Sequence, residues 1–454
     1  MNPTTENFDA IIIGTRCAGN AAAVALAERG AKVLGIDSAA FPSDTLSTHL
    51  LWPSTLAEIH AIGALQGVEA LGAPRMPLAQ ADLEGIEWQV GYTPYNGINY
   101  AMCVRRKGLD EVFLNAAIRA GADMRQECRA TELIRRDGRV CGVTYVDKAG
   151  TEHVVNAPLV IGADGRKSFV AEQVRATEPY RSKPSGRACF FAYWSDPQPE
   201  LRHIAAQWRV GGLLGTAFPC DDGDLLSLLQ PPVAMAAEFK GRKAQDAYLR
   251  GIEAIPGLAK RLAGAELKSR VRSCTDIESY FRTAAGPGWA LAGDAGHFKD
   301  PVTAQGIRDA LRYGRLLGEA VAPVLGAAGP VDVAALDTAT RGWARRRELD
   351  CLEIYQWTNM LAEGQPPTPI EHEVYHRAAG DSAYANIFTD VFSRSARPAE
   401  MTRAIPVLEM TAKALRRPGN DRRAVLGDLV GQGKRIVRNG IERERVAHTT
   451  TPVA

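Results

Sequence analysis

The sequence lacks three features that each point to a particular class of protein. Its eight cysteines are scattered, with no C-x-x-C pair and no cysteine–histidine cluster of metal-binding spacing, so we expect free thiols in a reducing cytoplasm and no bound metal. No stretch reaches about 18 uninterrupted apolar residues, and the N-terminus has no basic region followed by an apolar core, so neither a transmembrane segment nor export is expected. The net charge of +2 gives no reason to expect nucleic acid as a partner.

What is present begins with an N-terminal segment that has the pattern strand, tight turn, helix, strand. The apolar run 10–13 leads into Gly14 and Gly19, and a second apolar run ends at Asp37. A helix N-terminus offers unpaired N–H groups to a pyrophosphate, while Gly14 permits the sharp turn and Gly19 lets helix and strand approach. Asp37 stands at the distance expected for a ribose-binding carboxylate. Arg16 replaces the usual middle glycine, so a unit that binds no dinucleotide is the alternative for this segment alone.

A second informative segment follows the apolar run 288–292. It contains Gly293-Asp294-Ala295-Gly296-His297, then Pro301, then Gln305-Gly306-Ile307 at the start of a long helical stretch. This resembles the G-D-A-x-H, P, G-x-G signature of the flavoprotein monooxygenase family typified by p-hydroxybenzoate hydroxylase, which also includes geranylgeranyl-reductase-like enzymes. Ala304 departs from the signature, since it stands where the first glycine of G-x-G would be. A helix N-terminus aimed at N1 and O2 of a flavin stabilises the anion that forms on reduction.

Two further segments resemble the same family. Residues 162–168 contain Asp164 and Gly165 and resemble the internal D-G motif, which contacts FAD and is implicated in nicotinamide use; the arginine that usually closes it is missing, since Ala171 follows Val170. Residues 105–110 resemble the R-x-x-L-D entry to a helix. All four segments occur in the family order.

The resemblance implies one bound FAD. It assigns the ribityl hydroxyls to Asp294, places Pro301 beside the isoalloxazine ring, and makes Arg106 a flavin contact. We further expect Arg16 to contact the pyrophosphate or the flavin edge with its side chain. The complete expected cofactor-binding set is Gly14, Arg16, Ala18, Gly19, Asp37, Arg105, Arg106, Asp164, Gly165, Gly293, Asp294, Pro301, Gln305, Gly306 and Ile307.

The predicted fold is α/β, with a Rossmann-like FAD-binding domain, an inserted antiparallel β-sheet substrate domain and a helical C-terminal region. A chain of 454 residues exceeds one ordinary core, so two or three domains are expected. Asp37, Asp164 and Asp294 must reach one cofactor, so the FAD-binding domain is assembled from several pieces. Short β-rich runs from 187 to 229 predict the antiparallel sheet. The expected division is 1–75, 98–175 and 286–325 for FAD, 76–97 and 176–285 for substrate, and 326–454 for the helical region.

Within the helical region, amphipathic helices are predicted at 333–360 and 399–415. The arginine-rich tail beyond them is interpreted as a solvated helix face.

The implied activity is that of a single-component monooxygenase, or hydroxylase. NADH or NADPH acts as transient reductant, O2 adds to C4a of the reduced flavin, and the resulting hydroperoxide transfers one oxygen atom to a small organic, aromatic or polyketide-like substrate. The alternative is a reductase of a carbon–carbon double bond, as in geranylgeranyl reductases. Halogenation is disfavoured because no W-x-W-x-I-P motif is present. A homodimer stays an open alternative.

Two histidines are candidate catalytic residues. His49 lies in the loop after the second strand, where it is a proton donor or substrate contact, or else a loop histidine bonded to backbone. His297 holds the histidine position of G-D-A-x-H, which is either structural or chemical. Side chains along the predicted substrate sheet alternate between its two faces. The residues whose direction the sequence leaves open are Tyr193, Trp194, Gln207 and Trp208.

Overall fold

A six-stranded, mostly parallel sheet forms the centre of the fold. The computed structural model describes residues 6–448 apart from 46, 48, 240, 328, 402 and 403. Apolar strands buried on both faces are typical of central parallel strands, and β2 and β12 have that character. From edge to edge the order is β20 (Ala285–Gly286), β21 (Trp289–Leu291), β12 (Leu159–Gly162), β2 (Ala10–Ile13), β3 (Val33–Ile36) and β8 (Asp123–Arg125), with only β20 antiparallel to its neighbour.

Helices α1 (Cys17–Ala27) and α8 (Gly306–Leu325) pack closely against each other beside this sheet. The contact depends on small residues: a Cβ on Gly314 would lie 2.3 Å from the carbonyl oxygen of Ala18, and one on Gly318 would lie 2.9 Å from that of Ala22. Since both helices follow the carboxyl ends of parallel strands, their N-termini lie at the same edge of the sheet.

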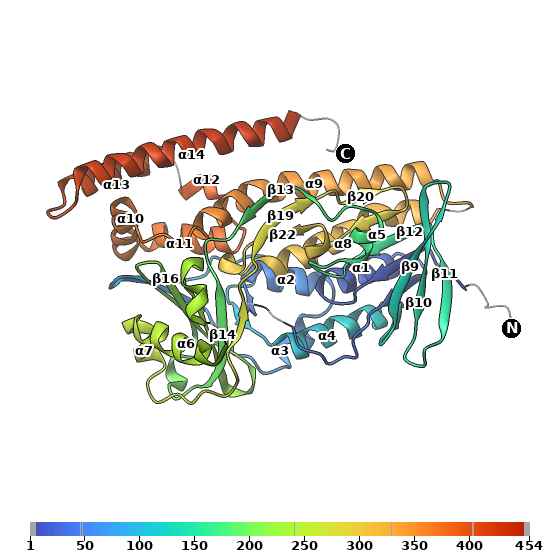
Figure 1. The fold of residues 1–454 in the computed structure, drawn as a ribbon, viewed down its shortest axis with the longest axis horizontal. Coiled ribbons are helices and arrows are strands. Elements are labelled where there is room, and N and C mark those ends of the chain that lie inside the picture. Colours follow the sequence, from blue (N-terminus) through green and yellow to red (C-terminus); the bar gives the residue numbers. More distant parts are fainter. Residues whose placement is uncertain are drawn as a thin grey trace.

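Further helices and small sheets surround this core (Figure 1). The helices are α2 (Pro53–Ala61), α3 (Leu65–Glu69), α4 (Arg106–Arg119), α5 (Phe169–Gln173) and α9 (Val333–Leu361). A four-stranded sheet contains β1 (Glu6–Asn7), β11 (Glu152–Asn156), β10 (Arg139–Val146) and β9 (Arg129–Arg136). A three-stranded sheet contains β13 (Pro179–Pro184), β19 (Glu278–Arg282) and β22 (His297–Phe298), and β4 (Leu50–Leu51) pairs with β7 (Met102–Cys103).

The second large sheet has seven strands and is the predicted substrate sheet. All its neighbouring strands are antiparallel except β5 and β15, which pair in parallel. The prediction of a purely antiparallel sheet missed this pair, because the hairpin β5–β6 comes from an earlier insertion in the chain and joins the edge of the sheet. Its outer face packs against α6 (Ala244–Glu253) and α7 (Pro256–Arg261). The strand order is β18 (Arg272–Cys274), β14 (Cys189–Ser195), β17 (Asp224–Gln230), β16 (Leu213–Pro219), β15 (Ile204–Val210), β5 (Leu78–Leu83) and β6 (Ile86–Gly91).

The register settles which side chains of this sheet face outward. Trp194 and Trp208 belong to the core under α6 and α7, and the Trp194 indole donates to the Tyr248 hydroxyl at 3.2 Å. Tyr193 and Gln207 therefore point to the opposite face, toward the first sheet.

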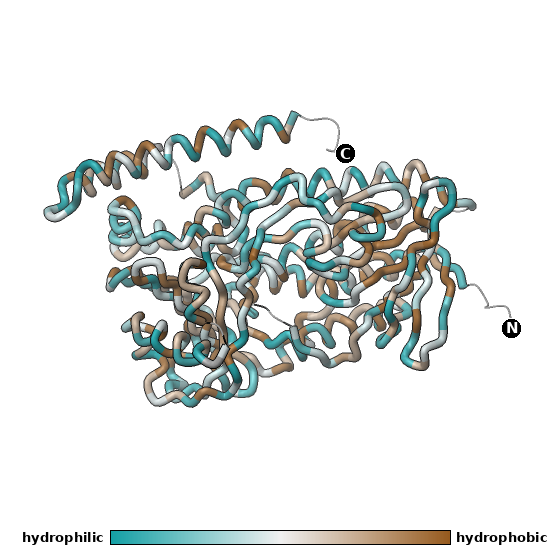
Figure 2. Tube along the Cα trace, in the orientation of Figure 1, coloured by the Kyte–Doolittle hydropathy of each residue, from teal (hydrophilic) through white to brown (hydrophobic). Residues whose placement is uncertain are grey.

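The C-terminal region consists of helices, as predicted, but with more of them than the sequence indicated. Helices α10 (Pro369–Gly380) and α11 (Ser382–Phe392) follow α9 and contact β6. The stretch predicted as helix at 399–415 is covered by α12 (Pro398–Met401) and α13 (Ala404–Arg416), and residues 402 and 403 lie outside the described residues. Helix α14 (Arg422–His448) lies beside α9, and Figure 2 shows hydrophilic and hydrophobic residues alternating along it. In the part of the chain that the structure describes, no helix is long and apolar enough to span a membrane. The predicted fold class is confirmed.

Candidate active site

The turn between β2 and α1 has the geometry of a phosphate-binding loop. Gly14 has φ +92°, and a Cβ there would lie 2.5 Å from the carbonyl oxygen of Ala163. A Cβ on Gly19 would lie 1.9 Å from the carbonyl oxygen of Gly14, so neither position accepts a side chain. The first turn of α1 has no side-chain cap and no acidic residue. Its free N–H groups and partial positive charge therefore remain available to an anion.

Asp37 is fixed beside this loop at the carboxyl end of β3. Its carboxylate accepts hydrogen bonds from the backbone N–H of Thr15 at 2.8 Å and of Ala39 at 2.9 Å. Each carboxylate oxygen can accept more than one hydrogen bond. The held carboxylate can thus still accept a hydrogen bond from a ribose hydroxyl.

A buried carboxylate joins the two arginines predicted nearby. Asp110 is fully buried and accepts from the Arg106 guanidinium through two bonds of 2.9 Å and from Arg16 at 2.5 Å. Arg16 also donates to the Ser43 hydroxyl at 2.7 Å and lies over the Phe41 ring. Asp110 was absent from the predicted site, although its i,i+4 spacing from Arg106 within R-x-x-L-D was a readable signal. A cofactor contact by Arg16 stays a prediction.

Asp294 presents a carboxylate without a partner. Among the described residues no side chain or backbone group donates to it, while its backbone oxygen accepts from the Tyr280 hydroxyl at 2.7 Å. Burial raises the pKa of Asp294 to about 6, and the positive charges of Arg106 and Arg166 act in the opposite direction. Gly293, with φ +57°, lets the turn pass close to Ala18, whose Cβ would lie 2.9 Å from an added Cβ. An unpaired carboxylate at this place suits hydroxyl donors.

The start of α8 explains the departure at Ala304. This residue adopts the left-handed conformation, with φ +50°, that a glycine adopts at little cost and that costs an alanine about 1 kcal/mol. A Cβ on Gly306 would meet nothing within 4 Å. Ile307 is buried behind it. The helix N-terminus therefore opens onto free space.

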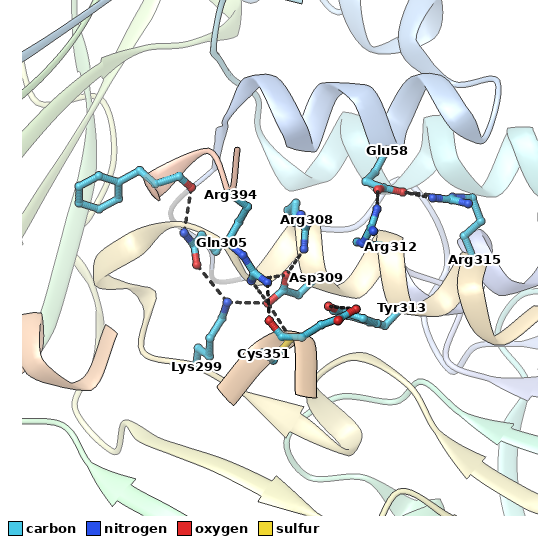
Figure 3. A network of polar contacts seen from close by, with 12 residues as sticks. Glu58, Lys299, Gln305, Arg308, Asp309, Arg312, Tyr313, Arg315, Cys351 and Arg394 are labelled. Atoms are coloured by element: carbon cyan, nitrogen blue, oxygen red, sulfur yellow. Dashed lines mark hydrogen bonds and ion pairs between the residues drawn. The ribbon is translucent and has the colours of Figure 1, made fainter. Parts of the chain in front are cut away.

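Gln305 does not cap its own helix (Figure 3). Its amide donates to the carbonyl oxygens of Val391 at 3.2 Å and Phe392 at 2.8 Å, while Lys299 donates to its side-chain oxygen at 3.0 Å. The segment from Lys299 to Gln305, just before α8, is thereby connected to the end of α11.

Other predicted cofactor residues have their side chains engaged within the protein. Arg105 donates to Asp222 at 2.6 Å, forms an ion pair with Asp224 and lies 4.3 Å from the centre of the Tyr193 ring. It therefore faces the substrate sheet. Asp164 accepts from Ser168 at 2.5 Å and from the backbone N–H of Val170 at the start of α5. Gly165 has φ +81°. Cofactor contacts by Arg105, Asp164 and Gly165 stay predictions.

His49 lies between the two large sheets. It is buried, its Nε2 is 3.0 Å from the Tyr193 hydroxyl, and its Nδ1 has no partner in the described part of the chain. Burial, aided by the charge of Arg106, lowers the pKa of His49 to about 4. The ring is therefore neutral at pH 7 and can both donate and accept a proton.

His297 is held in place by its surroundings. Its ring stacks on Phe281 at 3.9 Å between centres, and its Nδ1 donates to the Tyr280 carbonyl at 2.8 Å. Burial lowers the pKa of His297 well below its usual value. The neutral ring leaves Nε2 as an acceptor without a partner among the described atoms.

A small buried group of potential metal ligands contains His297, Asp309 and Cys351. Asp309 is, however, ion-paired with Lys299 at 2.5 Å, Arg308 at 2.9 Å and Arg394 at 3.2 Å (Figure 3). A metal cation there would face three positive charges at short range. The prediction of no metal stays a prediction.

A cavity separates the Pro301–Ala304 loop from the substrate sheet. A second, smaller one lies between Asp294 and Gly306. Among the described residues, no charged side chain lines the larger cavity. Its lining residues are Leu50, Trp52, Ala79, Gln80, Ala81, Trp88, Ala205, Gln207, Thr216, Phe218, Leu228, Gln230, Pro301, Val302, Ala304, Thr389 and Phe392.

Known proteins resemble the chain in sequence. Residues 7–188 match the family described as FAD binding domain. Tryptophan 2-halogenase of Chondromyces crocatus is 27% identical over 334 residues, 71% of this chain and 62% of that protein, so the chain spans less than two thirds of the halogenase. Digeranylgeranylglycerophospholipid reductase of Methanocella arvoryzae is 26% identical over 342 residues, 73% of this chain and 81% of that protein.

Solved structures share the fold. A flavoprotein/dehydrogenase of Cytophaga hutchinsonii superposes with a TM-score of 0.71 at 19% identity, covering 86% of this chain and 93% of that one. PqsL of Pseudomonas aeruginosa, described as "a probable FAD-dependent monooxygenase", superposes with a TM-score of 0.64 at 19% identity, covering 84% of this chain and 100% of that one. The protein is thus an FAD-binding flavoprotein. The match to the FAD binding domain family and the similarity to flavin-dependent halogenases and reductases confirm the predicted resemblance and the predicted class of enzyme, an FAD-dependent oxidoreductase.

Proposed function

We propose that the protein is a single-component, NAD(P)H-using monooxygenase that inserts one oxygen atom from O2 into a small, uncharged, aromatic or polyketide-like molecule. The observation that carries the proposal is the uncharged cavity between the Pro301–Ala304 loop and the substrate sheet. Aromatic rings and short apolar side chains dominate its lining, and charged groups do not enter it. An oxygenase needs such a site because water diverts activated oxygen from the substrate.

The residues at the carboxyl edge of the first sheet fit FAD. The uncapped start of α1 would hold the pyrophosphate, Asp37 the adenosine ribose and the unpaired Asp294 carboxylate the ribityl hydroxyls. The open space over Gly306 leaves the N-terminus of α8 free to face the flavin ring. When bound, FAD supplies the redox and oxygen-activating chemistry, with NADH or NADPH as transient reductant.

The C-terminal helix α11 excludes water from the cavity. The Phe392 ring stacks on Trp52 at 5.3 Å between centres, and the Trp52 indole donates to the Thr303 carbonyl at 3.0 Å. Gln305 holds the same end of α11 through the Phe392 carbonyl. The end of α11, which forms a cap over the cavity, and the Pro301–Ala304 loop are therefore joined both by ring packing and by buried hydrogen bonds.

His49 and Tyr193 are the groups we assign to proton handling. When the Tyr193 hydroxyl donates to Nε2, the ring proton lies on Nδ1, which has no partner among the described residues. A neutral imidazole with one satisfied and one open nitrogen can give up a proton and regain it through its partner. His49 is therefore the proposed proton donor, placed beside the cavity next to the lining residue Leu50 and not in the lining itself.

A reductase of a carbon–carbon double bond is the second candidate, and the likeness to the Methanocella reductase favours it. The cavity argues against a long isoprenoid substrate, since Phe392 and Trp52 close it on the side of α11. Halogenation is not proposed, because the W-x-W-x-I-P motif is absent.

The test is oxygen uptake by the FAD-loaded protein with NADH or NADPH, with and without small aromatic compounds. A monooxygenase consumes oxygen and nicotinamide in step with hydroxylated product. Phe392→Ala should shift consumption from product toward hydrogen peroxide, because it opens the cap. Val391→Ala is the matched control, since Val391 lies at the same helix end and packs against α9 but does not line the cavity. Substrate reduction without oxygen uptake would reject the oxygenase in favour of the reductase.

A further inference from the structure

A single row of side chains crosses the substrate sheet and lines the cavity. The strand register pairs Trp88 with Ala81, Ala81 with Gln207, Gln207 with Thr216 and Thr216 with Leu228. Directly paired residues point to the same face of a sheet, and neighbouring strands lie about 4.8 Å apart. All five residues belong to the cavity lining. Gln207 and Thr216 thus lie next to each other in the row, with Ala81 between Gln207 and Trp88.

The polar members of this row have no partners. Trp88 and Thr216 are 7% and 6% exposed, and both the indole N–H and the hydroxyl lack any hydrogen bond in the described part of the chain. The Gln207 amide likewise has no partner among the described residues. Buried polar groups are nearly always hydrogen-bonded, so unpaired donors on residues that line a cavity point to a ligand as their partner. The indole only donates, so its partner must be an acceptor.

The cavity also restricts the charge of that ligand. In the part of the chain that the structure describes, no aspartate, glutamate, lysine, arginine or histidine lines it. A carboxylate or ammonium group would lose its hydration there without gaining an opposite charge. A neutral molecule with carbonyl, ether or hydroxyl oxygens satisfies the open donors without that cost.

We propose that Trp88, Gln207 and Thr216 form a specificity subsite that recognises oxygen atoms along one edge of a neutral, flat substrate. Ala81 leaves space beside Trp88 for the ring edge, and Leu228 continues the row with an apolar contact. The inference rests on the proposed function, since it takes this cavity as the place where the substrate binds. It adds the three residues that would select that substrate by its oxygen pattern.

The experiment measures binding to the FAD-loaded protein by equilibrium dialysis. The probes are 1,8-dihydroxyanthraquinone, which carries three oxygens on one edge, anthracene, which carries none, and anthraquinone-2-carboxylate, which is charged. Trp88→Phe retains a large ring without the N–H, and Thr216→Val retains the shape without the hydroxyl. Each should weaken binding of 1,8-dihydroxyanthraquinone by about 2- to 10-fold, the factor for one neutral hydrogen bond, and leave anthracene unchanged.

Ser227→Ala is the matched control. Ser227 is a fully buried, unpaired hydroxyl on the same sheet, but it points to the opposite face, so its removal should change neither affinity. Equal weakening for both neutral probes, unchanged affinity for the dihydroxyanthraquinone in both variants, tighter binding of the carboxylate, or no binding of any probe would overturn the subsite. Oxygen uptake is measured separately. Selective binding without oxygen uptake would support the subsite and reject the monooxygenase.

Discussion

The affinity of the apoprotein for FAD should fall as the pH drops through about 6. The reason is that burial raises the pKa of Asp294 to about 6, against the opposing charges of Arg106 and Arg166. The ionised carboxylate only accepts hydrogen bonds, which suits the ribityl hydroxyls, whereas the protonated group needs an acceptor for its own proton. A ligand that prefers the ionised form binds more tightly above the pKa and more weakly below it.

The size of the effect follows from the same contact. A charge-assisted hydrogen bond contributes about 1.5–3 kcal/mol, so Asp294→Asn or Asp294→Ala should raise Kd for FAD by about 10- to 150-fold at pH 8. In the parent protein the rise between pH 8 and pH 5 is limited to about 10-fold, because about a tenth of the carboxyl groups are still ionised one unit below the pKa. Both variants should show no such rise.

The measurement is a titration of apoprotein with FAD, followed by flavin fluorescence at pH 5, 6, 7 and 8. Asp221→Asn is the control, because burial also raises the pKa of Asp221, which lies in the turn between β16 and β17 and should leave the pH dependence intact. A parent protein with constant affinity from pH 5 to pH 8, or an asparagine variant with the parental Kd at pH 8, would refute the assignment of Asp294.

Three further results are expected. Gly306→Ala should raise the free energy of unfolding of the apoprotein by up to about 1 kcal/mol and should weaken FAD binding. Gly342→Ala, at an equally open helix position in α9, should raise the free energy of unfolding without changing FAD binding. Identical behaviour of the two variants in urea unfolding and FAD titration would show that Gly306 faces no cofactor. Because the pKa of His49 is about 4, the unfolded chain binds a proton before the folded protein does, and the free energy of unfolding should fall by about 3 kcal/mol in total between pH 6.5 and pH 4. A His49→Asn variant with the parental pH slope in urea unfolding contradicts this. Arg16→Ala should bind FAD more weakly, and parental affinity would mean that Arg16 is merely tolerated.

Local motifs were readable because their constraints act within a few residues. Gly14 and Gly19 are required by a positive φ and by the close approach of helix and strand, both consequences of the βαβ turn itself. Asp294 follows a buried strand and begins a turn, so its place at the sheet edge could be predicted from the chain order. The left-handed Ala304 shows that the departure from the motif is one of residue type, with the backbone conformation retained.

Contacts between distant segments could not be predicted in this way. The sequence placed Arg105 and Arg106 side by side, but only folding brings Asp222 and Asp224 to Arg105. Folding likewise brings Arg16 to Asp110, the local i,i+4 partner of Arg106. Helix α11 carries no motif, and its role as a cap arises because Phe392 meets Trp52 across the fold.

The sequence by itself determined the FAD-binding class of the protein and the turns at Gly14 and Gly293, because backbone conformation and helix ends specify them locally. The tertiary structure alone decided which face of the second sheet lines the cavity. A shift of one residue in strand register reverses every side chain, and that register is set by pairing with strands from other parts of the chain. Gln207 and Thr216 therefore face the cavity, and Trp194 and Trp208 the core beneath it, for a reason that no single segment contains.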